Sequence, residues 1–417
     1  MSKLLIKGGS SLNGEVRIKG AKNAILPILA ATVLTEDECV ICDVPQLTDI
    51  TNMLKIIQGL GAKCTMEQGV VTVKNDDLTS YNVPTDLAKE LRSSFFLLGP
   101  ILGRMRRAVV AYPGGCDIGV RPLDIHLKGL REMGIAIEES HGMIYCDGTR
   151  LKGADVALDF PSVGATENLM MAAVLAKGTT RISNAAKEPE IVDLQNFLNA
   201  MGAKVSGAGS GRITVEGVSK LHGSVYTPVP DRIVAGTLLI AAATCGGNVC
   251  ITNAVPDHLE PLLFKMSKST CVLSVQGDKI TLRADGRPRG FDKLETQPYP
   301  GFPTDLQSQM MVMMSVAEGT GVIVENIFET RFRIVRELTK MGAMITVKDR
   351  AAVIRGVKGL EGAAVSAGDL RGGAALVIAG IRADGYTVID RANYIDRGYE
   401  SIEKTFGSLG AEIKRLE

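Results

Sequence analysis

The sequence predicts an α/β protein of six repeats, each roughly 70 residues long and each combining two helices with short strands. One observation is a turn of the form hydrophobic-Gly-Ala-x-β-branched, in which a helix ends and leads into a strand. It recurs, with a gap at Thr270 where the glycine is lost, at Gly61, Gly134, Gly202, Gly342 and Gly410. A second glycine marker has the same period: Gly178, Gly247, Gly319 and Gly385. Two independent markers with one period indicate a true internal repeat.

Each repeat contains the same elements in the same order. In the first repeat a strand leads to an apolar helix, a second strand, an amphipathic helix and two short strands, at residues 16–20, 23–34, 39–44, 50–60, 63–68 and 70–74. The glycine after the second helix suits a left-handed C-cap. The helix NLMMAAVLA (168–176) is apolar nearly all round, so we expect the first helix of each repeat to be buried. A passive solenoid scaffold is the alternative that these features alone leave open.

Composition excludes several classes of protein. The chain of 417 residues has a formal net charge of +1, 4% aromatic residues and no tryptophan. These values argue against binding of nucleic acid or of a membrane surface through positive charge or aromatic stacking. We expect no membrane span and no secretory signal, because the apolar runs are short and interrupted. Eight irregularly spaced cysteines favour reduced thiols and a cytoplasmic protein.

Cys39 and Cys42 form a C-x-x-C pattern within the strand-like run CVICDV. Residues i and i+3 of a strand point to opposite faces, and no second C-x-x-C follows. We therefore interpret this pair as part of a buried strand and predict no metal site.

Polar residues occupy the start of the first helix in all six repeats. These starts contain Lys22 and Asn23, Arg92, Ser162 and Gly164, Asp231 and Arg232, Thr304 and Asp305, and Asp369 and Arg371. Helix N-termini attract phosphate and carboxylate groups, although Ser, Thr and Asp are also ordinary N-caps, the commoner explanation for any single position. The helix dipole disfavours cations there, so Lys22, Arg92, Arg232 and Arg371 predict an anionic ligand.

Residues 112–126 form a second unusual segment, rich in glycine and proline around Cys116. Such a composition is typical of an exposed loop. Arg121 and His126 would favour the thiolate of Cys116, which makes it a candidate reactive residue. A plain surface cysteine in a glycine-rich turn is the alternative.

These motifs together resemble one family. GAKNAILP, LRSSFFLLGP, PGGCDIGVRPLDIHLKGL, SVGATEN, FPTDLQSQ, ENIFETRF, GDLRGGAAL and IDRGYE occur in the order found in the UDP-N-acetylglucosamine 1-carboxyvinyltransferases, and the resemblance covers essentially the whole chain. The related enolpyruvylshikimate phosphate synthases share the architecture but lack the PGGC loop. A catalytically inactive paralogue that binds the nucleotide sugar is a further alternative.

The resemblance implies a two-domain inside-out α/β barrel of six βαβαββ units. Residues 22–229 would form the first domain, residues 1–21 and 230–417 the second, with the active site in the cleft between them. The implied reaction transfers the enolpyruvyl group of phosphoenolpyruvate to the 3′-hydroxyl of UDP-N-acetylglucosamine and releases phosphate by addition and elimination. It is the first committed step of peptidoglycan synthesis and needs neither a metal nor an organic cofactor.

The resemblance also implies roles for individual residues. Cys116 would be the acid, would form a covalent adduct with phosphoenolpyruvate and would react with the epoxide fosfomycin; Asp305 would accept the sugar hydroxyl proton. Lys22, Arg121 and Arg397 would hold phosphoenolpyruvate. The path that binds the nucleotide sugar would be lined by Asn23, Arg92, Pro122, Leu123, Asp124, Ile125, Ser162, Val163, Gly164, Thr304 and Ile327. Asp231, Asp369 and Arg371 would support the hinge of the cleft. Phe160 stands where some members have a lysine near the uracil.

Overall fold

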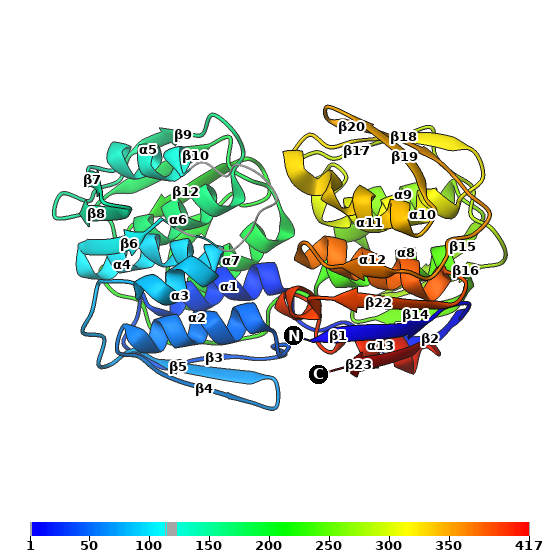
Figure 1. Cartoon of the computed structure of the whole chain (residues 1–417). Coiled ribbons are helices and arrows are strands. Elements are labelled where there is room, and N and C mark those ends of the chain that lie inside the picture. The colour runs from blue at the N-terminus through cyan, green and yellow to red at the C-terminus, as the bar shows by residue number, and fades with distance from the viewer. Residues whose placement is uncertain (1, 113, 115–122, 417) are drawn as a thin grey trace. The chain divides into compact units, whose positions relative to one another are not determined.

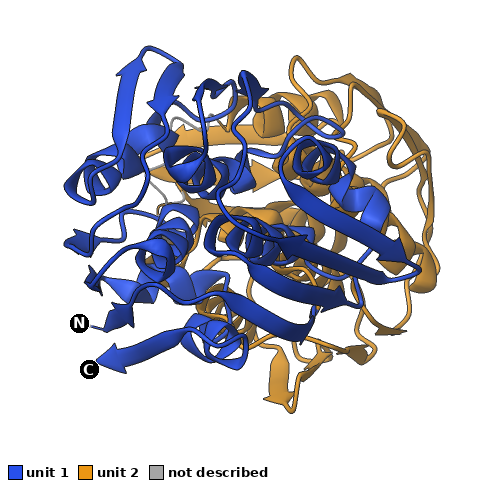
Figure 2. Cartoon of the chain, turned by 90° about the vertical axis from the view of Figure 1, so that its right-hand side faces the viewer, with its two compact units in different colours: residues 1–19, 117–120, 230–417 blue, residues 20–116, 121–229 orange. Residues whose placement is uncertain are grey.

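The computed structural model of the chain describes residues 2–112, 114 and 123–416 (Figure 1). The described residues form two compact units (Figure 2). Unit 1 comprises residues 2–19 and 230–416, and unit 2 comprises residues 20–112, 114 and 123–229. Each unit has one hydrophobic core. The N-terminal segment therefore folds with the C-terminal half of the chain.

Unit 1 contains three four-stranded sheets within the described ranges. In hydrogen-bonded order they are β15 (Cys271–Gln276), β16 (Lys279–Ala284), β14 (Gly247–Thr252) and β2 (Leu12–Arg17); β17 (Lys293–Glu295), β18 (Thr320–Val324), β20 (Ala351–Arg355) and β19 (Met344–Lys348); and β21 (Ala364–Ser366), β22 (Tyr386–Asp390), β1 (Lys3–Lys7) and β23 (Glu412–Leu416).

Unit 2 repeats this arrangement. Its sheets, again for the described residues, are β13 (Val225–Tyr226), β3 (Cys39–Ile41), β5 (Val70–Lys74) and β4 (Lys63–Glu67); β11 (Lys204–Ser206), β12 (Arg212–Glu216), β10 (Thr179–Ser183) and β9 (Asp155–Ala157); and β6 (Arg107–Ala111), β8 (Met143–Asp147) and β7 (Ala136–Ser140). An isolated parallel bridge between Asn82 and Val109 extends the last sheet.

The strand order confirms the predicted repeat. In four sheets a parallel pair, such as β9 and β10, is followed by an antiparallel hairpin, such as β11 and β12. In a fifth sheet, the parallel pair of β21 and β22 is followed by β1 and β23, an antiparallel pair from the two ends of the described chain. A parallel pair requires a crossover connection, and a helix provides it. The first helices of the repeats are α1 (Lys22–Thr32), η1 (Arg92–Leu97) with α4 (Leu98–Met105), α6 (Val163–Ala173), α8 (Arg232–Cys245), η3 (Thr304–Leu306) with α10 (Gln307–Val316), and α12 (Leu370–Arg382).

The second helices connect the parallel pair to the hairpin. They are α2 (Thr48–Gly59), α5 (Asp124–Glu132), α7 (Pro189–Ala200), η2 (Pro256–Leu259) with α9 (Glu260–Ser267), η4 (Glu329–Arg333) with α11 (Ile334–Lys340), and η5 (Ala392–Arg397) with α13 (Ile402–Ser408); α3 (Thr85–Glu90) is an addition. Positive φ angles occur at all five glycines that end second helices: Gly61, Gly134, Gly202, Gly342 and Gly410. This confirms the predicted left-handed caps.

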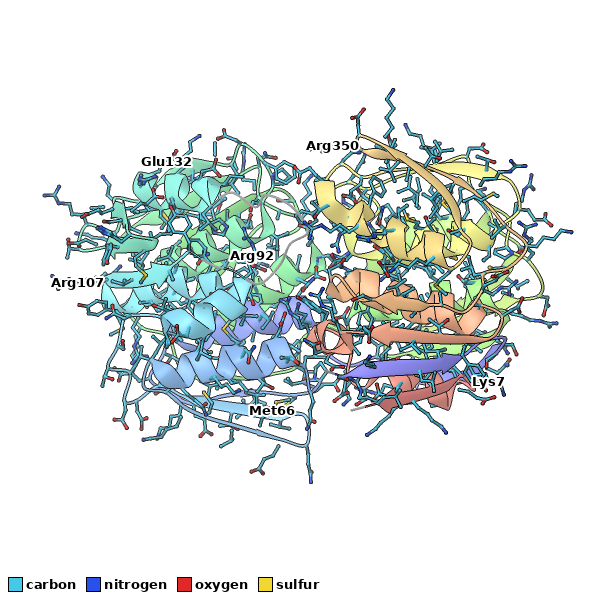
Figure 3. The ribbon with its side chains drawn as sticks, in the orientation of Figure 1. Lys7, Met66, Arg92, Arg107, Glu132 and Arg350 are labelled. Carbon is cyan, nitrogen blue, oxygen red and sulfur yellow. The ribbon has the colours of Figure 1, made fainter. Side chains whose placement is uncertain are left out.

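The first helices are buried and the sheets lie outside them. In unit 1, α8, α10 and α12 contact one another, and every residue of α10 is buried. Strands such as β1 alternate between buried and exposed residues because only one face packs on the core. Exposed charges such as Lys7, Arg107 and Arg350 lie on the outer side (Figure 3). The inside-out α/β architecture is therefore confirmed for each unit.

One predicted element has a different partner. The strand expected at residues 16–20 precedes α1 in the chain, but only residues 16–17 lie in a strand, at the end of β2, which pairs in parallel with β14 of unit 1. In the sheet that contains β3, the strand after α1, the parallel partner of β3 is β13 instead. The assignment of this strand to the first repeat was wrong, because the chain passes from unit 1 to unit 2 between residues 19 and 20.

The two cysteines of the C-x-x-C pattern lie in and directly after a strand, as expected. Cys39 is buried in β3, and Cys42 lies one residue beyond its end, half-buried. Burial raises the pKa of the Cys39 thiol to about 11, as expected for an unreactive core residue.

None of the helices in the described ranges is long and apolar enough to span a membrane.

Candidate active site

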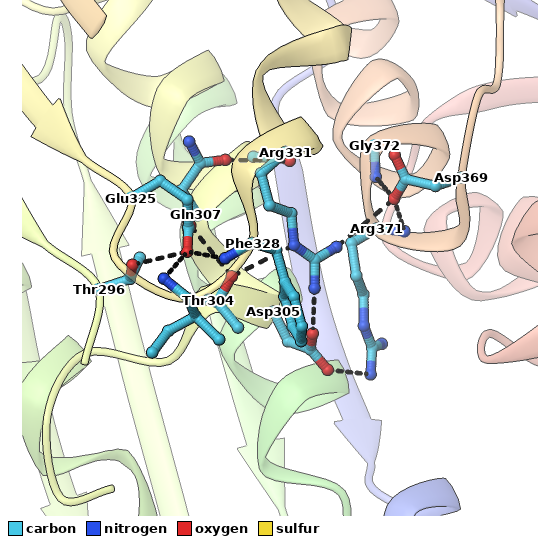
Figure 4. A network of polar contacts seen from close by, with 12 residues as sticks. Thr296, Thr304, Asp305, Gln307, Glu325, Phe328, Arg331, Asp369, Arg371 and Gly372 are labelled. Atoms are coloured by element: carbon cyan, nitrogen blue, oxygen red, sulfur yellow. Dashed lines mark hydrogen bonds and ion pairs between the residues drawn. The ribbon is translucent and has the colours of Figure 1, made fainter. Parts of the chain in front are cut away.

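Asp305 lies in η3, at the start of α10, and two arginines bind its carboxylate (Figure 4). Arg331 Nη2 donates to Oδ1 at 2.5 Å and Arg371 Nη2 donates to Oδ2 at 3.0 Å. The arginine side chains are 2% and 4% exposed, whereas the Asp305 side chain is 24% exposed. A solvent-accessible carboxylate is thus fixed on both oxygens by two buried cations, with charge-assisted hydrogen bonds.

Arg331 connects the starts of two inner helices. Its Nε donates to Thr304 Oγ1 at 3.2 Å, and its Nη1 lies 3.5 Å from Asp369 Oδ1. Asp369 is the N-cap of α12, where its Oδ1 accepts the backbone N–H groups of Arg371 and Gly372. The planar guanidinium can make these contacts at once because its donors point in fixed, divergent directions.

Arg371 extends the network to a third helix. Although burial opposes its charge, the carboxylates of Asp305 and Asp231 keep the pKa of this guanidinium above its usual value. The guanidinium lies over the Tyr399 ring, 5.5 Å from the centroid. The Tyr399 hydroxyl hydrogen-bonds Thr237 Oγ1 on α8 at 2.8 Å and accepts from Gln309 on α10 at 3.2 Å. The N-terminal ends of α8, α10 and α12 are therefore joined around Asp305.

The remaining unit 1 candidates lie at the ends of nearby elements. Asp231 is the N-cap of α8 and its Oδ1 accepts from the amides of Ile233 and Val234 at 2.8 and 2.9 Å. Arg397 is the last residue of η5 and is half-buried. Ile327 follows β18, and its amide donates to Glu325 Oε1 at 2.8 Å.

In unit 2, Lys22 is the first residue of α1 and Asn23 follows it. Lys22 Nζ lies 2.7 Å from Asp49 Oδ2, with side-chain exposures of 11% and 3%. A carboxylate of the same chain thus compensates this helix-start cation, as Asp305 does for Arg371. The position of these two cations at helix starts is therefore compensated within the chain, and the anionic ligand stays a prediction.

A second group in unit 2 surrounds the start of α6. Ser162 is the N-cap and its Oγ accepts from Ala165 N at 3.3 Å. A Cβ added at Gly164 would lie 3.1 Å from the His126 ring, which shows that α5 packs closely here. Asn168 donates to His126 Nδ1 at 3.0 Å. Burial, reinforced by the charge of Arg92, lowers the pKa of His126 to about 3.

Most of the other predicted residues of unit 2 lie at or near the starts of η1, α5 and α6. Arg92 is half-buried at the start of η1, and Val163 is the first residue of α6. Leu123 and Ile125 are half-buried, whereas Asp124 is exposed at the start of α5. Phe160 is 46% exposed. Cys116, Arg121 and Pro122 lie outside the described residues.

Sequence reasoning missed Arg331 and Glu325. Both belong to the ENIFETRF motif, which marked the family resemblance but received only one role, at Ile327. The sequence signal that could have identified them is the pair of charged residues on either side of the apolar pair Ile327 and Phe328, before a second helix. Neither residue lies at the start of a first helix, the position that the repeat marks.

Known proteins resemble the chain over its full length. The family model described as EPSP synthase (3-phosphoshikimate 1-carboxyvinyltransferase) matches residues 6–406. UDP-N-acetylglucosamine 1-carboxyvinyltransferase 2 of Caldanaerobacter subterraneus subsp. tengcongensis is 52% identical over 416 residues, covering 100% of both chains. UDP-N-acetylglucosamine 1-carboxyvinyltransferase of Thermotoga maritima is 48% identical over 419 residues, covering 100% of this chain and 99% of that protein.

Solved structures share the fold. The enolpyruvyl transferase NikO from Streptomyces tendae superposes with a TM-score of 0.89 at 22% identity, covering 100% of this chain and 99% of that chain. EPSP synthase from Acinetobacter baumannii gives a TM-score of 0.76 at 17% identity, with full coverage of both chains. At these identities the structural likeness shows a common fold.

Proposed function

The chain belongs to the EPSP synthase family of enolpyruvyl transferases, and we propose roles for its individual residues in the transfer reaction. Within that family it belongs with the UDP-N-acetylglucosamine 1-carboxyvinyltransferases, which act in peptidoglycan synthesis. It is therefore a transferase, and neither a shikimate phosphate acceptor nor a non-catalytic role is favoured. The substrates that we propose are UDP-N-acetylglucosamine and phosphoenolpyruvate.

The proposed chemistry has two steps. The 3′-oxygen of the sugar bonds to C2 of phosphoenolpyruvate while a proton adds to the C3 methylene, and the sugar hydroxyl loses its own proton. A proton then leaves the new methyl group, the C2–O bond to phosphate breaks, and the C2–C3 double bond is restored. Such a sequence requires a proton donor, a proton acceptor and cations for phosphate and carboxylate groups.

Asp305 is the proposed proton acceptor. The observation that carries this assignment is its fixed, accessible carboxylate, held on both oxygens by the buried Arg331 and Arg371. A proton acceptor must be oriented to within a fraction of an ångström, and a rigid charged support provides that orientation. The same two guanidinium groups place positive charge where an anionic substrate would meet Asp305.

Other residues would supply the remaining functions. Lys22, together with Arg121 and with Arg397 of unit 1, would bind the charged groups of phosphoenolpyruvate. The N-terminus of α6, with Ser162, Val163 and Gly164, suits the diphosphate of the nucleotide because an 11-residue helix directs its dipole there. Cys116 would donate the proton. We propose that the reaction proceeds without a metal or organic cofactor, in the cytoplasm.

The test uses Cys116, whose role rests on the sequence. Wild-type protein and Cys116→Ser are incubated with fosfomycin and UDP-N-acetylglucosamine, and intact masses are measured. We expect the wild type to gain one epoxide mass and Cys116→Ser to gain none. Replacement of Cys42, a half-buried cysteine, by serine is the matched control and should leave the mass gain intact. A wild type that neither gains mass nor releases phosphate would contradict the proposed function.

A further inference from the structure

Glu325 is a buried carboxylate that the proposed mechanism does not use. It directly follows β18 and is 1% exposed. Its Oε1 accepts three hydrogen bonds, from Thr296 Oγ1 at 2.8 Å, from Ile327 N at 2.8 Å and from Phe328 N at 3.0 Å. One oxygen therefore fixes the turn that contains Ile327, a residue assigned to the nucleotide-sugar path.

The second oxygen binds a different segment. Glu325 Oε2 accepts from Thr304 Oγ1 at 3.0 Å, and the same hydroxyl accepts from Arg331 Nε at 3.2 Å. Arg331 in turn binds Asp305. A continuous chain of contacts thus runs from Glu325 through Thr304 and Arg331 to the proposed proton acceptor (Figure 4).

We propose that Glu325 is a positioning residue for enolpyruvyl transfer. It fixes the position of Asp305 relative to the turn that contains Ile327, the residue assigned to the nucleotide-sugar path. The inference rests on the proposed function. Its physical basis is that one rigid carboxylate binds both segments through different oxygens, so neither segment can shift without breaking a buried hydrogen bond. Loss of a hydrogen-bond partner in such a buried network costs more free energy than loss of one at the surface, because water cannot replace the buried partner.

The variant Glu325→Gln separates the two halves of this arrangement. A glutamine can keep its carbonyl oxygen toward Thr296 Oγ1 and the amides of Ile327 and Phe328, since all three are donors. Its NH₂ group must then face Thr304 Oγ1, which already accepts from Arg331 and loses the acceptor for its own proton. The variant therefore preserves the turn at Ile327 and disrupts only the link to Thr304 and Asp305.

The experiment measures phosphate release at varied UDP-N-acetylglucosamine, with circular dichroism as a check of folding. We expect kcat of Glu325→Gln to fall by roughly 10- to 100-fold, the effect of a small displacement of a catalytic group. KM for UDP-N-acetylglucosamine should stay within about threefold, because the turn remains held. Glu337→Gln is the matched control: Glu337 on α11 also accepts a backbone amide, from Ser366 at 3.0 Å, and we expect unchanged kinetics.

A second comparison tests whether Glu325 acts through Thr304. Thr304→Val removes the shared hydroxyl, and the double variant with Glu325→Gln should lose no more activity than the more impaired single variant. Thr304→Ser keeps the hydroxyl and should retain most of kcat. The inference is overturned if folded Glu325→Gln has wild-type kcat, if Glu337→Gln falls equally, or if the two losses multiply. An inactive wild type would instead overturn the proposed function.

Discussion

Lys22 Nζ lies 2.7 Å from Asp49 Oδ2 within unit 2, and the two side chains are 11% and 3% exposed. Lys22 begins α1 and Asp49 lies in the first turn of α2, so the ion pair joins the first and second helices of one repeat. The α1 dipole opposes a cation at this position, whereas the α2 dipole favours the carboxylate. The pair therefore holds a substrate-binding candidate in an otherwise unfavourable place.

Replacement of Lys22 separates stability from activity. Lys22→Met leaves the buried Asp49 carboxylate without this cation and should lower the free energy of unfolding by about 3 kcal/mol, as for other broken buried pairs. The double variant Lys22→Met, Asp49→Asn should recover most of that stability but no turnover. Urea unfolding and phosphate release measure the two quantities. Recovery of both together would assign Lys22 a structural role alone.

Asp305→Asn tests the proton acceptor. The amide nearly preserves the shape of the side chain but cannot take a proton, so kcat should fall by roughly 10²- to 10⁴-fold. Initial rates of phosphate release measure this. Asp155→Asn is the control, because Asp155 forms an exposed ion pair with Arg181 at 3.3 Å, and its rate should equal that of the wild type. A fully active Asp305→Asn enzyme would rule out the assigned role.

His126 should stay neutral at pH values where an ordinary histidine is charged. Asn168 Oδ1 accepts from Gly99 N at 2.8 Å, which orients its amide group so that Nδ2 donates to His126 Nδ1. The ring proton is therefore on Nε2. Histidine NMR between pH 8 and 4 should show this tautomer throughout, since burial lowers the pKa of His126 to about 3. A titration near pH 6.5 would contradict the buried contact.

The same shift predicts a pH dependence of stability. The unfolded chain binds a proton at this histidine below about pH 6.5, whereas the folded chain does so only near pH 3. Between these values the unfolded state holds more protons, so the contribution of His126 to stability is complete above pH 6.5 and is lost as the pH falls. Urea unfolding as a function of pH should show this decline, with a smaller slope for His126→Gln.

Two glycine substitutions test the packing of the inner helices. A Cβ at Gly99 in α4 would lie 2.3 Å from the Asn168 backbone oxygen in α6, whereas nothing lies within 4 Å of one at Gly407 in α13. Gly99→Ala should therefore destabilise the protein by about 1–3 kcal/mol through overpacking. Gly407→Ala should be neutral or stabilising by up to about 1 kcal/mol, because alanine favours helix. Thermal unfolding measures both; equal effects would contradict close packing of α4 on α6.

Local sequence patterns predicted the repeat and its helix starts. The glycines after second helices have positive φ, and such a backbone position favours glycine strongly enough to be visible in one sequence. The position of Asp305 at a first-helix start followed from the same period, and the structure confirms that placement. Features determined within a few residues were therefore predictable.

Long-range pairing was not predictable in this way. The strand before α1 pairs with β14, because the chain changes unit after residue 19, and no local propensity marks that crossing. Arg331 contacts Asp305 from another helix entry, and Glu325 contacts Thr304 from the end of β18. Such contacts depend on tertiary packing of segments that are separated in sequence, so residue type and period do not determine them.

Phosphate release by the purified protein shows which acceptor receives the enolpyruvyl group. Release is measured with phosphoenolpyruvate alone, with UDP-N-acetylglucosamine alone, with both, and with phosphoenolpyruvate plus shikimate 3-phosphate. We predict release only when phosphoenolpyruvate and UDP-N-acetylglucosamine are present together, with an enolpyruvyl ether of the nucleotide sugar as the second product. Release with shikimate 3-phosphate, or no release with phosphoenolpyruvate and UDP-N-acetylglucosamine, would contradict the proposed function.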